Sequence, residues 1–279
     1  MREQAKQRIG FGILLLATLA IVLPVLLIIG LIIDKGASAI SLEFLFAMPR
    51  DGMKAGGIFP AIVGTFILVV VSMAFSLPIG VLAAIYLSEY AKDNALTRVI
   101  NLAIINLAGV SSVVYGLFGL SLFVVFLKFG ASILAGSLTL GIMTLPVIIT
   151  TTREALRAIP RSYREVSVSL GATKWQTVRH SVLPFATPGI LTGAILSVGR
   201  VAGETAPILF TVAAFYLPRL PHSLFDQAMA LPYHLYITST QIPGIAENTR
   251  YGTALVLVGL VLIMNVTAVV IRARFRRKR

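Results

Sequence analysis

Long apolar runs, separated by shorter polar segments, constrain this chain more than any other feature. A membrane-crossing helix needs about 20 mainly apolar residues to span a hydrocarbon core of ~30 Å. The runs that we interpret as spans cover residues 9–33, 58–87, 99–127, 133–152, 185–217 and 251–271. Composition agrees, because 57% of the residues are hydrophobic and 13% are charged, with a mean hydropathy of +0.91. We therefore predict an all-α integral membrane protein with six transmembrane helices and a single domain over residues 1–279.

The distribution of Lys and Arg predicts how the chain is oriented. If both termini share one side, that side carries 17 of these residues, and the three opposite loops carry six. The positive-inside rule places the richer side in the cytoplasm, together with both termini and the loop 153–184. The tail 272–279 holds six cations, and we expect it to bind anionic lipid head groups rather than nucleic acid.

Signatures of catalysis and of cofactor binding are missing from the sequence. The chain has no cysteine, which excludes disulfides, thiolate chemistry and cysteine metal sites. It also has no G-x-x-x-x-G-K-[ST] loop, so it cannot hydrolyse ATP by that route. His180, His222 and His234 are scattered and do not form a metal-binding set. We expect no catalytic residue, no metal and no cofactor in this chain.

The loop 153–184 is the longest polar interruption and carries seven Lys, Arg or His residues. Ser162 precedes Glu165, and Thr173 precedes Gln176, each at the spacing of a capping box that opens a helix. Gly171 lies between them, where a helix can end in the left-handed conformation that glycine adopts readily. We expect two short helices joined by a glycine hinge, which either contact a partner or serve as a structural cap.

One cation lies inside an apolar run. Arg200 is ~15 residues into the fifth span, which places it near the bilayer midplane at a rise of about 1.5 Å per residue. A central Arg costs about 2.5–3.5 kcal/mol on insertion scales, so its presence requires a reason. Steps of three and four residues predict a stripe on one helix face that holds Ser197, Arg200, Glu204, Ile208 and Thr211.

Two interpretations of this stripe stay open. Arg200 and Glu204 can form an ion pair that only fixes helix packing. Alternatively, Arg200 presents its guanidinium to an anion that crosses the membrane, and Glu204 holds the Arg when the pathway is empty. The planar fork of donors suits an oxyanion better than Lys does. We therefore assign Ser197, Arg200 and Glu204 to a predicted substrate pathway.

The loop 153–184 resembles the signature loop of ABC-importer permeases, in which E-A-A is followed by a Gly six residues after the Glu and later by I-x-L-P. Glu165, the pair Gly171-Ala172 and the pair Leu183-Pro184 match this pattern. The chain departs from it with Val166 and Ser167 for the two alanines and Ser181 for the isoleucine. In that family the loop docks on a separate ATPase subunit. The resemblance implies that role for Glu165, Gly171, Ala172, Thr173 and Trp175.

A narrower likeness covers most of the chain. The segments GVSSVVYGLFGL, SVGRVAGETAPILFT and FDQAMALPYHLYI resemble the phosphate-importer permease of the PstA type. Its R-x-x-G-E-T-A-P core maps onto the run from Arg200 to Pro207. Ser111 stands where that family usually has Pro, which weakens the expectation of a bend in the third span. The resemblance implies a type I importer fold with a peripheral first helix and a five-helix core.

The same likeness implies a bacterial cytoplasmic membrane and a set of partners: a homologous PstC-like permease, two ATPase subunits and an extracytoplasmic phosphate-binding protein. We expect alternating access driven by ATP. Another oxyanion such as sulfate or molybdate, or an ion-coupled secondary transporter, remains an alternative. Six spans without an inverted repeat are few for the secondary class.

The outer loop 218–250 is longer than a connection needs and holds aromatic and apolar residues among prolines. These are Leu224, Phe225, Met229, Leu231, Tyr233 and Tyr236. One interpretation is a surface helix that receives the binding protein and occludes the pathway. The other is an amphipathic helix that lies on the membrane.

Overall fold

The structure is a computed structural model that describes residues 2–277, and it is mainly helical. Among these residues, five helices are long and apolar enough to cross a membrane, or six if one bent pair counts as a single span. The long helices are α1 (Arg2–Gly36), α3 (Phe59–Ile85), α6 (Ile133–Arg157), α9 (Leu183–Gly203) and α12 (Glu247–Arg277). The shorter α-helices are α2 (Leu42–Phe46), α4 (Ala95–Ala108), α5 (Ser112–Gly119), α7 (Ser162–Ser169), α8 (Lys174–Gln176), α10 (Ala206–Thr211) and α11 (Leu231–Thr240). A two-stranded antiparallel sheet pairs β1 (Pro49–Arg50) with β2 (Ala55–Gly56).

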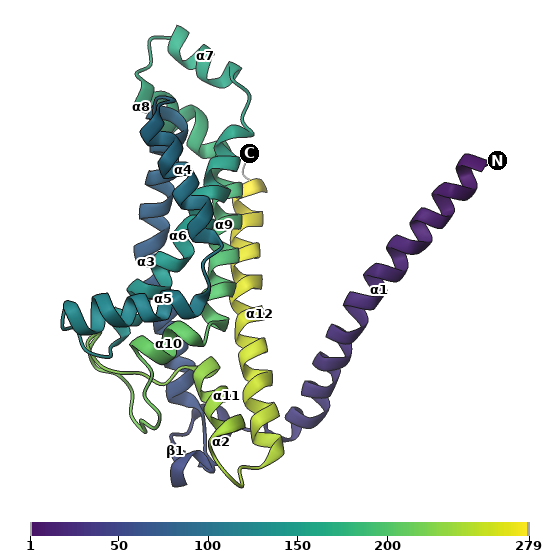
Figure 1. The fold of residues 1–279 in the computed structure, drawn as a ribbon, viewed down its shortest axis with the longest axis vertical. Coiled ribbons are helices and arrows are strands. Elements are labelled where there is room, and N and C mark those ends of the chain that lie inside the picture. The colour runs from purple at the N-terminus through teal and green to yellow at the C-terminus, as the bar shows by residue number, and fades with distance from the viewer. Residues whose placement is uncertain (1, 278–279) are drawn as a thin grey trace.

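The helices α3, α6, α9 and α12 form the bundle: α3 packs against α6, α6 against α9, and α9 against α12. Leu68, Leu140, Val201 and Ile208 are almost completely buried inside it. Helix α1 contacts α12 near its own C-terminal end and then diverges from the bundle (Figure 1). Its apolar side chains are exposed on every side, as expected for a helix that lies in lipid or against another subunit.

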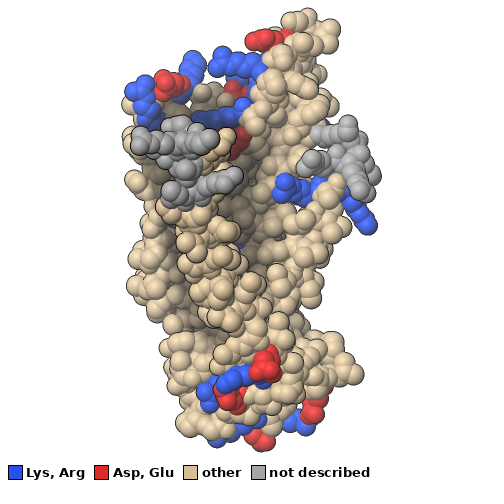
Figure 2. All heavy atoms as spheres, turned by 90° about the vertical axis from the view of Figure 1, so that its right-hand side faces the viewer, with Lys and Arg blue, Asp and Glu red and all other residues tan. Residues whose placement is uncertain are grey.

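The charged side chains visible on one face of the molecule lie mainly toward its two ends. On the face shown in Figure 2, Lys, Arg, Asp and Glu gather at both ends, and a broad belt between them is free of visible charge. This pattern is typical of a protein whose middle section crosses a hydrocarbon layer. The predicted lipid-binding tail 272–279 continues past residue 277 and so extends outside the described residues.

The predicted third span, 99–127, is not one straight helix. Helix α4 ends at Ala108, and α5 starts at Ser112 after a bend of 105°. No proline causes the bend. Instead, Ser111 adopts an extended conformation, and the Tyr115 hydroxyl donates a hydrogen bond of 3.0 Å to the carbonyl of Leu107 in the last turn of α4. The same carbonyl also accepts from Val110 N at 3.1 Å, so the Tyr115 side chain ties the start of α5 back to the end of α4.

The predicted fifth span, 185–217, is also wrong as a single helix. Helix α9 ends at Gly203, Glu204 is extended, and α10 covers only Ala206–Thr211. Pro207 explains the break, because it has no N–H to donate to the carbonyl of Gly203 and its ring would clash there. Proline is well tolerated in the first turn of the new helix α10, where it lies.

The start of this span and the end of the fourth also differ from the prediction. Helix α8 continues through the π-helix η5 (Thr177–Val182) into α9, which gives a helical segment Lys174–Gly203 of 30 residues. Helix α6 runs past residue 152 to Arg157, so Arg153 belongs to this helix and not to the polar loop. There its Nη1 donates to Asn101 Oδ1 of α4 at 2.6 Å.

Candidate functional site

The ion pair predicted from the sequence is present, with Arg200 Nε 3.4 Å from Glu204 Oε1. The two side chains are 33% and 18% exposed. Arg200 lies in the last turn of α9, and Glu204 lies just beyond the helix end, so the two residues do not share a helix face as predicted. The predicted stripe is therefore interrupted, and Ile208 and Thr211 belong to a separate helix, α10.

The Arg200 guanidinium keeps most of its donors free. Among the described residues, Glu204 is its hydrogen-bond partner, through Nε alone. Both Nη groups are therefore available to a ligand, and a planar guanidinium can offer them as a two-pronged donor. A cation at the carboxyl end of α9 is also favoured by the helix dipole, which reduces the cost of keeping the charge at this depth.

Two helix breaks meet beside this pair. Helix α5 packs against α10, and Gly116 of α5 permits the close approach. A Cβ at Gly116 would lie 2.7 Å from the Phe210 ring and 3.1 Å from the carbonyl oxygen of Ala206. Non-helical backbone at membrane depth is tolerated where it is enclosed by protein or lines a water-filled cavity.

Ser197 does not accompany Arg200 on an exposed surface. It is completely buried, and its hydroxyl has no hydrogen-bond partner among the described residues. Asn265 of α12, which was not among the predicted site residues, lies close to Gly199, the neighbour of Arg200: a Cβ at Gly199 would lie 3.2 Å from Asn265 Nδ2. Its Oδ1 is buried and also has no partner among the residues described. An Asn in the middle of the sixth apolar run was the signal that could have identified it.

The polar loop forms α7 and α8 with Gly171 between them, as the sequence predicts. Gly171 has φ +82°, a left-handed conformation in which a side chain is strained. The capping box at Thr173 is confirmed: its Oγ1 accepts from Gln176 N at 3.3 Å, and Gln176 Oε1 accepts from Thr173 N at 2.8 Å. Ala172 is half-buried beside the hinge.

The capping box predicted at Ser162 is wrong. Ser162 is the first residue of α7, Arg161 is the N-cap residue, and no side chain caps this end. The backbone begins the turn earlier than predicted, since Tyr163 N bonds to Pro160 O and Arg164 N bonds to Arg161 O. Glu165 is therefore free of a capping role and is exposed on the first turn of α7.

The loop presents an apolar surface that the other described residues leave uncovered. Trp175 is 47% exposed, and Leu170 is 82% exposed. Val166 and Val168 of α7 are more than half exposed as well. Apolar side chains grouped at the polar end of a membrane protein are typical of a site that binds another protein.

The outer loop contains the expected helix, α11, but this helix does not lie on a surface. Tyr233, His234 and Ile237 are buried, and Leu231 N donates to Thr65 Oγ1 of α3 at 2.8 Å. Burial on several sides contradicts the alternative of an amphipathic helix lying on the membrane. Leu224 and Phe225 of the loop and Tyr236 of α11 are exposed.

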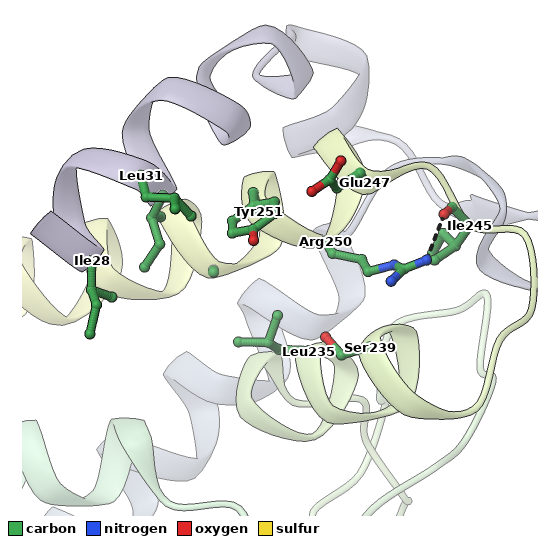
Figure 3. A pocket seen from close by; sticks show the side chains of 10 residues that line it. Ile28, Leu31, Leu235, Ser239, Ile245, Glu247, Arg250 and Tyr251 are labelled. Carbon is green, nitrogen blue, oxygen red and sulfur yellow. Dashed lines mark hydrogen bonds between the residues drawn. The ribbon is translucent and has the colours of Figure 1, made fainter.

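A hollow of about 730 Å³ lies between α1, α11 and α12 (Figure 3). Arg250 reaches along it, and its Nη2 donates to the carbonyl of Ile245 at 3.0 Å, drawn as a dashed line in Figure 3. Leu31 of α1 and Leu235 of α11 form part of its apolar wall. Arg200 and Glu204 do not line this hollow, so it is separate from the predicted substrate residues.

The predicted site residues that the polar loop and the α9 break contribute thus fall into two separate groups. Arg200 and Glu204 lie at the break after α9, and Glu165, Gly171, Ala172, Thr173 and Trp175 lie in the polar loop. Helical backbone from Lys174 to Gly203 connects them, and its part from Lys174 to Arg200 spans about 39 Å at 1.5 Å per residue. The structure therefore links the two groups mechanically although they are not in contact.

The structure combines a bundle of apolar helices, two of whose spans are broken, with a polar loop that exposes apolar side chains. This combination is typical of a multi-pass membrane permease that works with other subunits. The chain belongs to the family described as binding-protein-dependent transport system inner membrane component, which matches residues 76–279. It is thus an inner-membrane permease subunit of an ABC importer. In such importers ATP is hydrolysed by a separate subunit, and both an ATPase and a substrate-binding protein are expected as partners.

Several relatives match along most of their length. The probable ABC transporter permease protein YqgI of Bacillus subtilis is 36% identical over 251 residues, 85% of each chain. The phosphate transport system permease protein PstA 1 of Mycobacterium tuberculosis strain H37Rv is 32% identical over 284 residues, which cover 100% of this chain and 91% of the relative. The corresponding PstA of Mycobacterium leprae is 34% identical over 271 residues, with coverages of 95% and 88%.

Solved structures share the fold. A bacterial ABC transporter for the acidic polysaccharide alginate superposes with a TM-score of 0.64 at 14% identity, covering 92% of this chain and 95% of that chain. An inward-facing MetNI methionine ABC transporter gives a TM-score of 0.61 at 19% identity, with coverages of 78% and 94%. Both confirm the predicted importer permease fold.

Proposed function

We propose that this chain is the PstA-type permease subunit of an ATP-driven importer for inorganic phosphate and forms half of its translocation pathway. The similarity to relatives named as phosphate transport permeases extends over nearly the whole chain, which supports phosphate as the substrate. The single observation that supports an anionic substrate is the position of the Arg200 guanidinium. It lies at a helix break, and neither of its Nη groups is bonded to a described residue. A tetrahedral oxyanion matches that donor geometry.

Glu204 then has a counter-charge role. It neutralises Arg200 while the pathway is empty, and an arriving anion competes with it for the guanidinium. The long separation of 3.4 Å between Nε and Oε1 suits such an exchange, because the pair is held without a short, fully formed hydrogen bond. Ser197 is assigned to the same pathway, and its buried hydroxyl would be reached only after a rearrangement of α9 and its neighbours.

Transport would proceed by alternating access. ATP binding closes the ATPase pair, and the loop with Glu165, Gly171, Ala172, Thr173 and Trp175 follows that motion. Since Lys174–Gly203 is helical throughout, movement of α8 carries directly to Arg200. The partners proposed are a homologous PstC-like permease, two ATPase subunits and an extracytoplasmic phosphate-binding protein, with α11 beside the entrance that the binding protein covers.

The orientation proposed places both termini and the loop 153–184 in the cytoplasm. The excess of Lys and Arg on that side supports it. The outer side then contains α11 and the hollow beside α1.

Radiolabelled phosphate uptake tests the proposal in proteoliposomes that contain the whole complex and its binding protein. Uptake should require ATP at the cytoplasmic face, resist a protonophore, and be competed poorly by sulfate and molybdate. Uptake that persists without ATP but fails with a protonophore would establish the secondary-transporter alternative instead. Stronger competition by sulfate or molybdate would reassign the oxyanion.

A further inference from the structure

Arg164 of α7 makes a network of hydrogen bonds that the function proposed above does not use. Its Nη2 donates to Glu89 Oε1 at 2.7 Å, and its Nε lies 3.3 and 3.2 Å from the two oxygens of the same carboxylate. Nη2 also donates to the carbonyl of Leu156 at 3.0 Å, and Nη1 donates to the carbonyl of Ile159 at 3.1 Å. Leu156 is in the last turn of α6, and Ile159 follows the end of that helix. One guanidinium therefore connects α7 to two other segments.

Glu89 belongs to η3 (Tyr86–Tyr90), a π-helical segment that continues α3 to its polar end. The ion pair is the most enclosed among the described residues, with side chains 23% exposed for Arg164 and 9% for Glu89. The other pairs include Arg98–Asp93, whose side chains are 71% and 81% exposed. An enclosed pair with well-made hydrogen bonds loses much stability when one partner is removed, because the other charge is left uncompensated.

The same segment η3 also contacts the second half of the polar loop. Lys174 Nζ, at the start of α8, lies 5.0 Å from the centre of the Tyr90 ring, within the range of a cation–π interaction. The two halves are joined to each other as well, since Thr177 Oγ1 donates to Ser167 Oγ at 3.1 Å. Neighbouring residues of η3 thus hold α7 on one side of Gly171 and α8 on the other.

Helix α7 has few other attachments. None of its residues is buried. Tyr163 packs edge-on against the Phe185 ring at the start of α9, with ring centres 4.9 Å apart. Among the described residues, the Arg164 network ties α7 directly to η3, at the end of α3, and to α6. A push on α7 can therefore reach α9 through Tyr163 and through the Ser167–Thr177 hydrogen bond, and Arg164 links it directly to α3 and α6.

We propose that Arg164 and Glu89 are positioning residues that couple α7 to α3 and α6, so that the ATPase moves three core helices and not α9 alone. This inference rests on the proposed function, in which the polar loop binds the ATPase. Glu89 and Arg164 touch neither substrate nor ATP in this proposal. They set the direction in which α7 moves when it is pushed.

The test measures phosphate transported per ATP hydrolysed by the reconstituted complex. Glu89→Gln and Arg164→Gln should each lower this ratio by at least about fivefold while the ATPase stays bound, because the uncompensated partner releases α7 from α3. Asp93→Asn is the matched control: it breaks an exposed pair at the same end of the molecule and should leave the ratio unchanged. An unchanged ratio in Glu89→Gln would overturn the proposal.

A rescue experiment separates coupling from simple misfolding. The chain has no cysteine, so Glu89→Cys/Arg164→Cys can be joined selectively by a short, reducible bifunctional thiol reagent. The double variant should be uncoupled before the reaction, coupled after it, and uncoupled again on reduction. Crosslinking that fails to restore the ratio refutes the positioning role.

Variants of the docking surface distinguish this inference from the function on which it rests. If Gly171→Pro and Trp175→Ala abolish coupling and Glu89→Gln does not, the Arg164–Glu89 inference fails and the docking role stands. If none of these variants affects coupling, the docking role of the polar loop fails as well.

Discussion

Arg200 offers the sharpest test of whether the intramembrane ion pair serves transport or only packing. Arg200→Ala removes the guanidinium but also leaves Glu204 without its partner in a site where that side chain is 18% exposed. A loss of uptake in this variant alone is therefore ambiguous. The double variant Arg200→Gln/Glu204→Gln removes both charges and keeps side chains of similar length, so it separates the two roles.

The expected magnitude follows from the donors that remain free. With Nε directed to Glu204, the two Nη groups can each donate a charge-assisted hydrogen bond to an oxyanion. Such bonds are worth about 1.5–3 kcal/mol each, so two of them contribute at least about 3 kcal/mol. Because about 1.4 kcal/mol corresponds to a factor of ten, uptake should fall about 100-fold or more in both the single and the double variant.

The assay is the initial rate of phosphate uptake by proteoliposomes at fixed, subsaturating binding protein. Basal ATPase activity and the apparent melting temperature of the complex report assembly, and both should be near wild type in the double variant. Uptake near the wild-type rate in Arg200→Gln/Glu204→Gln would refute the anion role, because a pair that only fixes packing can be replaced by two neutral amides.

Four further predictions concern the rest of the chain. Gly171→Ala places a side chain at φ +82°, which costs about 1–2 kcal/mol in the left-handed region. The phosphate uptake rate should fall, whereas the melting temperature of the permease measured without the ATPase should change little. Trp175→Ala should weaken ATPase binding about 30-fold, because it removes an interface anchor worth about 2 kcal/mol. Phe225 is similarly exposed but lies on the opposite side, so Phe225→Ala should leave ATPase binding unchanged. Burial lowers the pKa of His234 to about 4, below its ordinary value of 6.5, so the folded chain binds fewer protons than the unfolded chain between these two pH values. The free energy of unfolding should therefore be unaffected above pH 6.5 and lower by about 2 kcal/mol at pH 5. His234→Gln should reduce the fall in apparent melting temperature that accompanies this loss. Because the chain has no cysteine, single cysteines report orientation: Leu224→Cys should react with a membrane-impermeant maleimide in cells with an intact inner membrane, and Ala273→Cys should react only after that membrane is opened. The reverse pattern would contradict the proposed orientation.

Features governed by local sequence were predictable. Gly171 and the Thr173–Gln176 capping box depend on residues a few positions apart, and both are found where the pattern indicates. The Arg200–Glu204 pair was also predicted from spacing, although the reason proved different, since Glu204 reaches back from beyond the helix end. Pro207 was the signal for that break, because it removes the donor needed by the carbonyl of Gly203.

Features that depend on packing between distant segments were not predictable. The bend at Gly109–Ser111 has no proline, and it is stabilised by Tyr115 and by the packing of α5 on α10. Glu89 and Arg164 are 75 positions apart, and neither belongs to a recognisable motif with the other. The hydrophobic pattern of the outer loop likewise identified α11 but could not indicate that His234 would be buried against the bundle.

The most direct test of the central proposal is the specificity of uptake by the wild-type complex. In ATP-loaded proteoliposomes with the phosphate-binding protein, labelled phosphate should accumulate against its gradient, and non-hydrolysable ATP should not support accumulation. Excess sulfate or molybdate should leave the phosphate rate largely unchanged. Accumulation of sulfate or molybdate in preference to phosphate, or accumulation without ATP, would contradict the proposal that this chain is the permease of an ATP-driven phosphate importer.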